Sequence, residues 1–534
     1  MEYESGCVSY EEADVVVIGA GPAGLAAAIS ALNAGASVTV VEENDDIGGH
    51  GMVSGGTLHL GGGHRLQQQQ GIVDSAELVF SDWVRHDAIE SRFCDRDLVR
   101  VFADSNVAAF DFLVENGVEF LPHTVELRLD VDSVGPQSVP RLFRCREWPN
   151  PTQVVVRDSG RNGSGLVRPL ERSARQKGAT FLLRHKMTGL DRSRAGGPMD
   201  LVDCASERGT RRLRARGGIV LATGGSSGNV ALRRVFDPRL TEEYQHAGAP
   251  YSFQTGDGEM AAMAFGAALW CTAAQTAGTC LTLTKTWHIG CRWGYRGLKF
   301  RPDSPCFSRA RATGLTVTDW QNVILVKRNG KRFWNESDSG QGFFDAALAY
   351  CEGGTSLNGG GPIWAIFDQD AVEREDWDPR PPNVDPDYFA RGSSFEELTA
   401  NIRNPYQHGP MDGAALKQTV ERYNGFVAAG VDGDFGRPQP RYMIRRAPFF
   451  AAWATPILHD SLSGLRIDRN AAVLDLEGRH IRGLFCAGET HGGFPQHGMA
   501  RAIVFGRIAG ANAASSLHVA CSDKLGGRRQ YTRN

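Results

Sequence analysis

The stretch that most constrains the fold runs from Ala13 to Asn44 and reads ADVVVIGAGPAGLAAAISALNAGASVTVVEEN. An apolar strand over 15–18 leads directly into Gly-Ala-Gly-Pro-Ala-Gly, and an alanine-rich helix to about Asn33 precedes a second strand over 38–41. In such a β-α-β unit the first glycine permits a tight turn, the second admits a pyrophosphate, and the third allows close helix–strand packing. The unit therefore predicts a dinucleotide site, with Glu42 bonding a ribose hydroxyl pair. Its expected contact residues are Gly19, Gly21, Pro22, Ala23, Gly24, Glu42 and Glu43.

Length and charge narrow the class of protein further. A chain of 534 residues is too long for one compact core, so two or three lobes are expected. The net charge of -3 offers no basic surface for nucleic acid, and no nucleic-acid partner is expected. Because no apolar run approaches about 18 residues, no membrane-spanning helix is expected either.

The cysteine pattern bears on the redox compartment of the protein and on whether it binds a metal. The 11 cysteines form no Cys-x-x-Cys pair, which is typical of reduced thiols in a cytoplasmic protein. Residues 1–12 are polar and acidic, so no signal peptide is expected. The spacings of Cys271, Cys280 and Cys291 do not match structural zinc sites, and no bound metal is predicted.

Six further segments follow the first motif in a specific order. Together they resemble the FAD-dependent fumarate reductase and succinate dehydrogenase flavoprotein superfamily over nearly the whole chain, which implies FAD rather than NAD. The segments are IGGHGMVSGG (47–56), LATGGSSGN (221–229), TGDGEMAAMAFGAAL (255–269), RNGKRFWNE (328–336), VDGDFGRP (431–438) and IRGLFCAGE with IVFGRIAGANAA (481–514).

Two segments resemble one branch of this superfamily, the 3-ketosteroid Δ1-dehydrogenases. These are GGTLHLGGGHRLQQQQGIVDSAE (55–77) and GGFPQHG (492–498), the second overlaying a Tyr-Pro-Gly-Ala-Gly stretch. In that branch the tyrosine hydroxyl and the last glycine's N–H polarise a substrate carbonyl. Here Phe494 takes the tyrosine position and has no hydroxyl, so Gly498 and His497 are the candidate donors.

The resemblance also implies the remaining cofactor contacts. His50 stands where succinate dehydrogenases carry a histidine joined to the flavin; we expect a noncovalent histidine here, with a covalent link as the alternative. A helix from about Met499 points its N-terminus at the flavin N1 and C2 carbonyl, where negative charge gathers on reduction. A helix cap explains Asp257 as well as a cofactor contact does. The expected contacts are Gly48, Gly49, His50, Gly51, Ser54, Gly55, Gly56, Met187, Ala222, Thr223, Gly224, Asp257, Gly488, Glu489, Gly498 and Met499.

The segment PILHDSLSGLRID (456–468) resembles the fumarate reductase segment with two adjacent histidines. His459 keeps the first position, and Asp460 replaces the second, where a carboxylate would repel a dicarboxylate. WCTAAQTAGTC (270–280) also departs from the Gln-x-His-Pro-Thr motif of those enzymes, so fumarate and succinate are not expected substrates. The candidate catalytic residues are His459, Asp460, Tyr295, His497, Gly498 and Arg501.

These features predict an α/β fold. A Rossmann-type FAD-binding domain is split between residues 1–280 and 451–520, an α+β capping domain occupies 281–450, and 521–534 form a disordered tail. The leading functional expectation is desaturation of a CH–CH bond next to the carbonyl of a cyclic or hydrophobic ketone, with electrons passing to a quinone, O2 or a carrier. The absence of a Cys-x-x-Cys-His motif for an electron-entry haem favours that direction. The alternatives are a reductase of an activated alkene other than fumarate, and a non-catalytic flavin electron-transfer subunit.

Overall fold

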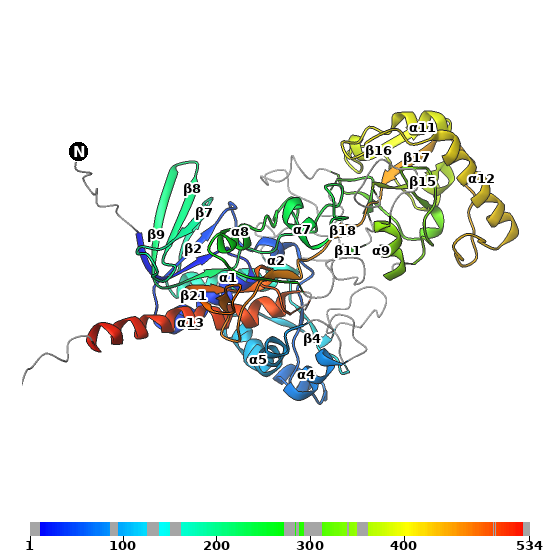
Figure 1. The fold of residues 1–534 in the computed structure, drawn as a ribbon. Coiled ribbons are helices and arrows are strands. Elements are labelled where there is room, and N and C mark those ends of the chain that lie inside the picture. The colour runs from blue at the N-terminus through cyan, green and yellow to red at the C-terminus, as the bar shows by residue number, and fades with distance from the viewer. Residues whose placement is uncertain are drawn as a thin grey trace, which may run out of the picture.

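The computed structural model describes residues 11–85, 94–124, 138–149, 162–271, 283–284, 288–292, 312–338, 341–349, 361–494, 496 and 498–526. Within them the chain forms two lobes that Figure 1 shows set apart from each other. We call them the nucleotide lobe, which contains both the first motif and the C-terminal helix, and the cap lobe, which lies between them in the sequence.

The nucleotide lobe is built on one mixed sheet with the strand order β20-β21-β9-β1-β2-β6. The pairs β21–β9, β9–β1, β1–β2 and β2–β6 are parallel, and β9 also pairs with the antiparallel hairpin β7–β8. The central strand β1 ends in a wholly buried apolar run because both of its faces are covered. The strands are β1 (Glu11–Ile18), β2 (Val38–Glu42), β6 (Thr180–Leu183), β7 (Lys186–Asp191), β8 (Leu201–Ser206), β9 (Gly209–Leu221), β20 (Ala472–Leu474) and β21 (His480–Cys486).

Helices and short strands complete this lobe. The helices are α1 (Pro22–Asn33), α2 (Gly49–Val53), α3 (Arg65–Gln69), α4 (Ala76–Val84), α5 (Arg96–Glu115), α6 (Asn162–Gln176), α7 (Val230–Phe236), α8 (Asp257–Met263), η5 (Gly488–Thr490) and α13 (Met499–Gly526). The short strands are β3 (Thr57–His59), β4 (Phe120–Thr124), β5 (Leu142–Cys145), β10 (Leu269–Cys271) and β19 (Ser463–Leu465).

The C-terminal segment returns to the same sheet as the N-terminal motif. Strand β21 pairs in parallel with β9, and α13 packs against α1 in one continuous apolar core. A Cβ added to Gly510 would overlap the carbonyl oxygen of Ala27, so the two helices are in backbone contact. This arrangement confirms the α/β class and the split Rossmann-type domain.

The cap lobe holds an antiparallel sheet of order β14-β15-β17-β16 between two apolar clusters. Strand β17 (Phe449–Trp453) pairs with both β15 and β16, so the cap sheet extends past residue 450. The other elements are β11 (Leu283–Thr284), β12 (His288–Ile289), β13 (Leu315–Thr316), η3 (Trp320–Asn322), β14 (Ile324–Lys327), α9 (Gln341–Leu348), β15 (Ile363–Asp368), α10 (Gln369–Arg374), η4 (Pro386–Tyr388), β16 (Phe389–Gly392), α11 (Phe395–Asn401), α12 (Gly413–Ala429) and β18 (Ile457–Leu458).

The expected disordered tail is partly wrong. Helix α13 continues to Gly526, because no glycine or proline interrupts the sequence from 511 to 525. Residues 527–534 lie outside the described residues. None of the helices described here has the length and apolar character needed to cross a bilayer.

Candidate active site

The three glycines of the first motif lie in different surroundings. Gly19 has a φ of 97°, and a Cβ there would overlap the carbonyl oxygen of Ala222. A Cβ on Gly24 would overlap the carbonyl oxygen of Gly19. A Cβ on Gly21, by contrast, would find only one described atom within 4 Å, the carbonyl oxygen of Gly48 at 3.9 Å. The loop thus leaves open space at Gly21, at the start of α1, where a pyrophosphate would fit. We call this space the cradle.

Glu42 ends β2 beside this loop and is only 6% exposed. Its carboxylate accepts hydrogen bonds from the backbone N–H groups of Ala20 (2.8 Å) and Asn44 (3.0 Å). Burial raises the pKa of Glu42 to about 7, although both hydrogen bonds oppose that shift. The carboxylate is therefore fixed at the carboxyl end of the parallel strands, the place where this fold binds a ribose.

Glu43, Asp257 and Met187, three of the expected cofactor contacts, lie on or beside β7. Lys186 of β7 forms ion pairs with Glu43 (3.5 Å) and with Asp257 (2.9 Å). The N-cap of α8 is Gly256, so Asp257 is not the helix cap considered above; its carboxylate pairs with Lys186 instead. Met187 is buried in β7 opposite Cys204 of β8.

The loop from Gly48 to Gly56 folds against the first motif. The N–H of Gly48 donates to the carbonyl oxygen of Ala20 at 2.9 Å, and a Cβ on Gly51 would overlap the ring of Pro22. Within the loop, the Ser54 hydroxyl donates to the carbonyl oxygen of Gly51 at 2.8 Å. Gly55 and Gly56 then lead into β3. The two glycine-rich loops thus form one continuous backbone surface.

The end of β9 lies next to the two glycine-rich loops and extends their backbone surface. The N–H of Ala222 donates to the carbonyl oxygen of Ile18 at 2.8 Å. The hydroxyl of Thr490, in η5, donates to the carbonyl oxygen of Gly224 (2.9 Å) and lies 3.3 Å from the Thr223 hydroxyl. Gly488 and Glu489 are therefore held against the end of β9 by hydrogen bonds from their own short helix.

A cluster of polar side chains lies over these loops. His50 Nδ1 is 3.2 Å from Glu489 Oε1 and 3.9 Å from Asp460 Oδ1. The rings of His50 and His459 have centroids 6.0 Å apart. Gln254 Nε2 donates to Glu489 Oε2 at 2.8 Å and lies 3.1 Å from His50 Nδ1. Residues from α2, the loop before α8, the loop after β18, and η5 thus converge; we call His50, Gln254, His459, Asp460 and Glu489 the polar cluster.

The polar cluster contains imidazole and carboxyl groups that can transfer a proton. The ligand atoms of His50, His459 and Asp460 all lie within 4.8 Å of one another, a spacing that a metal ion could also bridge. The sequence predicts no metal, and imidazole and carboxylate groups at this spacing also suit transfer of a proton to a substrate. Asp460 is only 4% exposed, so its charge acts at short range with little screening.

Arg501, another candidate catalytic residue, lies in the first turn of α13. Arg501 is 1% exposed and donates to the carbonyl oxygens of Phe494 (2.8 Å) and Ser461 (3.3 Å). Burial lowers the pKa of Arg501, while Glu489 and Asp460 oppose that shift. The backbone N–H of Arg501 donates to Gln496 Oε1 at 2.6 Å. In this arrangement Arg501 holds the loop before α13 rather than reaching for a substrate carboxylate.

Phe494 is a core residue in the structure. Its ring is fully buried against Trp83 and Phe102, with centroids 4.8 Å from each. Gly498 has a φ of 94°, with no described atom within 4 Å of an added Cβ, and the Met499 sulfur lies 3.2 Å from the Ser54 hydroxyl. The helix start therefore lies against the loop from Gly48 to Gly56. His497 and Tyr295 lie outside the described residues.

Three polar residues at this site were not singled out from the sequence. They are Gln254, Ser461 and Gln496, and each is nearly fully buried. Gln254 directly precedes the TGDG segment, and Ser461 directly follows Asp460, but no residue pattern marks either position. Their importance follows only from long-range hydrogen bonds.

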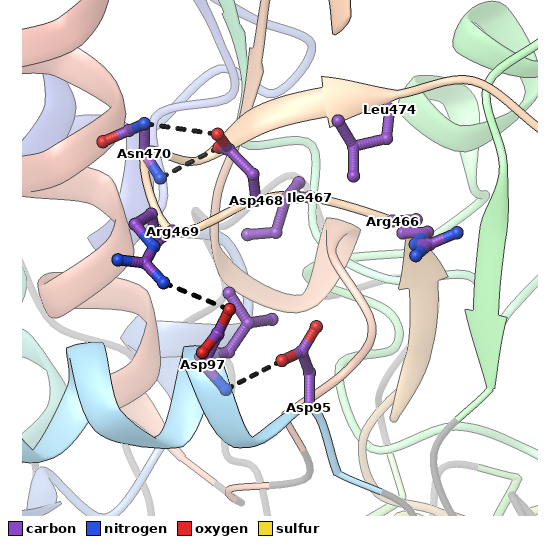
Figure 2. A pocket seen from close by; sticks show the side chains of 9 residues that line it. Asp95, Asp97, Arg466, Ile467, Asp468, Arg469, Asn470 and Leu474 are labelled. Atoms are coloured by element: carbon purple, nitrogen blue, oxygen red, sulfur yellow. Dashed lines mark hydrogen bonds and ion pairs between the residues drawn. The ribbon is translucent and has the colours of Figure 1, made fainter. Parts of the chain in front are cut away.

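A surface pocket of about 280 Å³ lies elsewhere, between the start of α5 and the segment joining β19 to β20 (Figure 2). Its polar groups are largely paired with one another: Arg469 with Asp97 at 3.2 Å, and Asn470 with Asp468. The pocket shares no residue with the polar cluster, and we assign no substrate to it. It is lined by Asp95, Asp97, Leu98, Arg466, Ile467, Asp468, Arg469, Asn470 and Leu474.

The fold and this site together define a flavin-dependent oxidoreductase. A family model described as an FAD binding domain matches residues 14–502, and the chain belongs to that family. The open cradle at Gly21 and the buried Glu42 fit the pyrophosphate and ribose of FAD. The protein is accordingly an FAD-dependent enzyme of the oxidoreductases that act on CH–CH bonds.

Relatives carry both reductase and dehydrogenase names. A urocanate reductase from Eggerthella lenta is 28% identical over 517 residues, covering 94% of this chain and 75% of its own. An acrylate reductase flavoprotein subunit from Shewanella woodyi is 28% identical and covers 92% and 87%. A 4-oxocyclohexanecarboxylate 2-dehydrogenase from Sinomonas cyclohexanicum is 27% identical and covers 89% and 87%. The fold resembles the open conformation of a flavocytochrome c3 fumarate reductase, with a TM-score of 0.65, 24% identity and coverage of 95% and 79%.

Proposed function

We propose that the protein is an FAD-dependent reductase of an activated alkene other than fumarate. The observation that carries the proposal is the polar cluster beside the open cradle at Gly21, because it combines a flavin position with several proton-transfer groups. The names of the urocanate and acrylate reductases support the same direction. This reverses the leading expectation from the sequence, in which desaturation came first.

FAD, when bound, would supply the hydride for the β-carbon of the alkene. The chain must then supply a proton to the α-carbon and hold the activating group of the substrate. His459 is the proposed proton donor, since its ring faces that of His50 across the site and it stands next to the Asp460 carboxylate in the sequence. In this proposal the backbone N–H groups of Gly498 and Met499, at the start of α13, stabilise the negative charge that develops in the reaction.

The charge of the polar cluster limits the substrate. The carboxylates of Asp460 and Glu489 both lie within 4 Å of His50, whereas Arg501 is occupied by two carbonyl oxygens. A second substrate carboxylate placed against Asp460 would be repelled. We therefore propose a substrate that is neutral or cationic at the end facing Asp460, which excludes fumarate.

Anaerobic reoxidation of the reduced flavin tests this function. The purified protein is reduced chemically and mixed with neutral enones, monocarboxylate and imidazole-bearing acrylates, and fumarate, while the flavin absorbance is followed. We expect rapid reoxidation by at least one alkene and none by fumarate. Asp460→Asn should keep FAD and begin to accept fumarate, whereas Asp104→Asn, an exposed control on α5, should change neither property.

Other results would favour another function. If saturated ketones instead bleach the oxidised flavin, the second candidate holds, which is desaturation of a ring ketone. The relative that supports it is the 4-oxocyclohexanecarboxylate 2-dehydrogenase. If the flavin responds to neither class of compound, a role in electron transfer alone remains.

We propose further that FAD is bound noncovalently. His50 is the residue that the resemblance links to a covalent flavin, and because its Nδ1 lies within hydrogen-bonding distance of Glu489 and Gln254, only Nε2 would be available for such a link. Acid precipitation of the protein should release all flavin into the supernatant. A yellow precipitate that turns colourless in His50→Ala would instead establish the covalent link.

A further inference from the structure

Gln254 is a buried member of the polar cluster with several side-chain contacts. It is 2% exposed, and its φ of 46° lies in the left-handed region that a non-glycine residue rarely adopts. Its side-chain oxygen accepts a hydrogen bond from the Ser227 hydroxyl at 2.5 Å. Its nitrogen lies 2.8 Å from Glu489 Oε2 and 3.1 Å from His50 Nδ1. A strained, buried amide that makes several side-chain contacts points to a defined task.

The orientation of this amide follows from its donors and acceptors. Because the Ser227 hydroxyl donates to Oε1, the two N–H groups of Gln254 face Glu489 and His50. A donor directed at His50 Nδ1 requires a lone pair there. The neutral imidazole then carries its proton on Nε2.

Glu489, the second neighbour of His50 Nδ1, favours the opposite tautomer. Glu489 Oε1 lies 3.2 Å from the same Nδ1 and would accept a proton from it. Among the residues that the structure describes, Asp460 at 3.9 Å, His459 and His246 also face His50, and burial lowers the pKa of His246 to about 3 with a smaller contribution from His50. The tautomer of His50 is thus decided by whether Gln254 or Glu489 controls Nδ1.

We propose that Gln254 is a positioning residue that holds His50 with Nδ1 as an acceptor and the proton on Nε2. His50 then presents a donor N–H on the side of its ring away from Gln254. The proposal rests on the proposed function only in assigning His50 to the active site. The loop that carries Ser227 is itself fixed, because buried Arg233 donates to the Ser227 carbonyl oxygen at 2.8 Å.

The tautomer can be measured directly. Protein labelled with 15N-histidine is studied by 1H–15N correlation spectra in the presence of EDTA, with and without FAD, and His50→Gln identifies the His50 signals. We expect an unprotonated Nδ1 and a protonated Nε2 in the wild type. Gln254→Met, similar in length and without a donor, should move the proton to Nδ1, where Glu489 accepts it.

Two further variants keep the test decisive. Ser227→Ala removes the bond that orients the amide and should give a mixture of tautomers in a folded protein. Gln321→Met changes a buried glutamine of the cap lobe and should leave the His50 signals unchanged. A protonated Nδ1 in the wild type, or the same tautomer in wild type, Gln254→Met and Ser227→Ala, would overturn the proposal.

Kinetics provides the link to turnover. In Gln254→Met we expect reoxidation by the alkene to slow by about 10- to 100-fold with little change in KM, as is typical when a supporting hydrogen bond to a functional histidine is lost. If no alkene reoxidises the wild-type flavin, the proposed function fails. The tautomer measurement still stands in that case, because it needs no substrate.

Discussion

The glycines of the first motif have separate physical roles at the residue scale. Gly19 and Gly24 are required because backbone atoms occupy the space that a side chain would need. Gly21 has an ordinary φ of -74°, so neither strain nor crowding within the chain requires a glycine there. The remaining reason for glycine at this position is room for the cofactor.

Substitutions should separate these roles. Gly21→Val should leave a folded protein that retains no FAD, because the side chain fills the pyrophosphate position. Gly24→Ala should lower the melting temperature even without FAD, because helix α1 must move away from β1. Flavin absorbance and thermal unfolding of the apoprotein measure the two effects. A yellow Gly21→Val protein would contradict the assignment of the cradle.

Glu42 predicts a pH dependence for the apoprotein. Its pKa is about 7 when folded and 4.5 when unfolded, so its protonated form favours the folded state. The stability that it contributes is complete below about pH 4.5 and is lost as pH rises through 7. The free energy of unfolding of Glu42→Gln relative to wild type should therefore rise between these limits. A difference that is constant with pH would show that the carboxylate stays ionised.

At the scale of elements, the contact between α1 and α13 joins the two halves of the split domain. Gly506 and Gly510 are spaced by four residues on α13, and an added Cβ on either would overlap a backbone oxygen of α1, at Ala23 or Ala27. The helices therefore pack at backbone contact, which places the start of α13 against the flavin loop.

Gly510→Ala should push the two helices apart. We expect a loss of about 1–3 kcal/mol in the free energy of unfolding, as is usual for overpacking, with weaker FAD retention. Gly425→Ala is the matched control, since Gly425 also lies inside a helix but has no described atom within 4 Å of an added Cβ. The control should gain about 0.5–1 kcal/mol from helix propensity. Equal effects of the two changes in urea unfolding would refute the packing argument.

At the scale of the whole molecule, the cap lobe has its own apolar clusters and its own buried charges. Arg332 donates to both carboxylate oxygens of Glu336 at 2.7 Å and to Asp432 at 2.9 Å, while Arg437 lies 3.3 Å from Glu336. The two arginines balance the two acids, and all four side chains are almost completely buried.

Glu336→Gln should unbalance this group by leaving a positive charge buried. We expect the cap lobe to lose about 3–5 kcal/mol of stability. Hydrogen exchange should accelerate in cap peptides and remain unchanged in β1, α1 and α13. Asp378→Asn, which breaks an exposed pair with Arg380, should have little effect on stability because the pair is screened by solvent. Faster exchange throughout both lobes would mean that they unfold as one unit.

The sequence alone determined the α/β class, the dinucleotide loop and the return of the C-terminal segment to the same domain. The return of the C-terminal segment follows from the resemblance to a known superfamily, and the other two follow from short contiguous patterns: an apolar run, glycines at fixed spacing and an acid after the second strand. Their geometry is local, so the residues that carry it are neighbours in the chain. His50, Glu489, His459 and Asp460 could likewise be singled out, because the segments around them resemble a known superfamily.

Only the tertiary structure decided how these residues act together. Gln254 reaches His50 and Glu489 across 204 and 235 positions of the sequence, and Arg501 reaches Ser461 across 40. The same is true of Phe494, whose place in the core depends on Trp83 and Phe102, and of β17, which joins the cap sheet beyond residue 450. A hydrogen bond or a packed ring depends on where distant segments meet, and that meeting is set by burial of the whole apolar core rather than by any pattern near the residue itself.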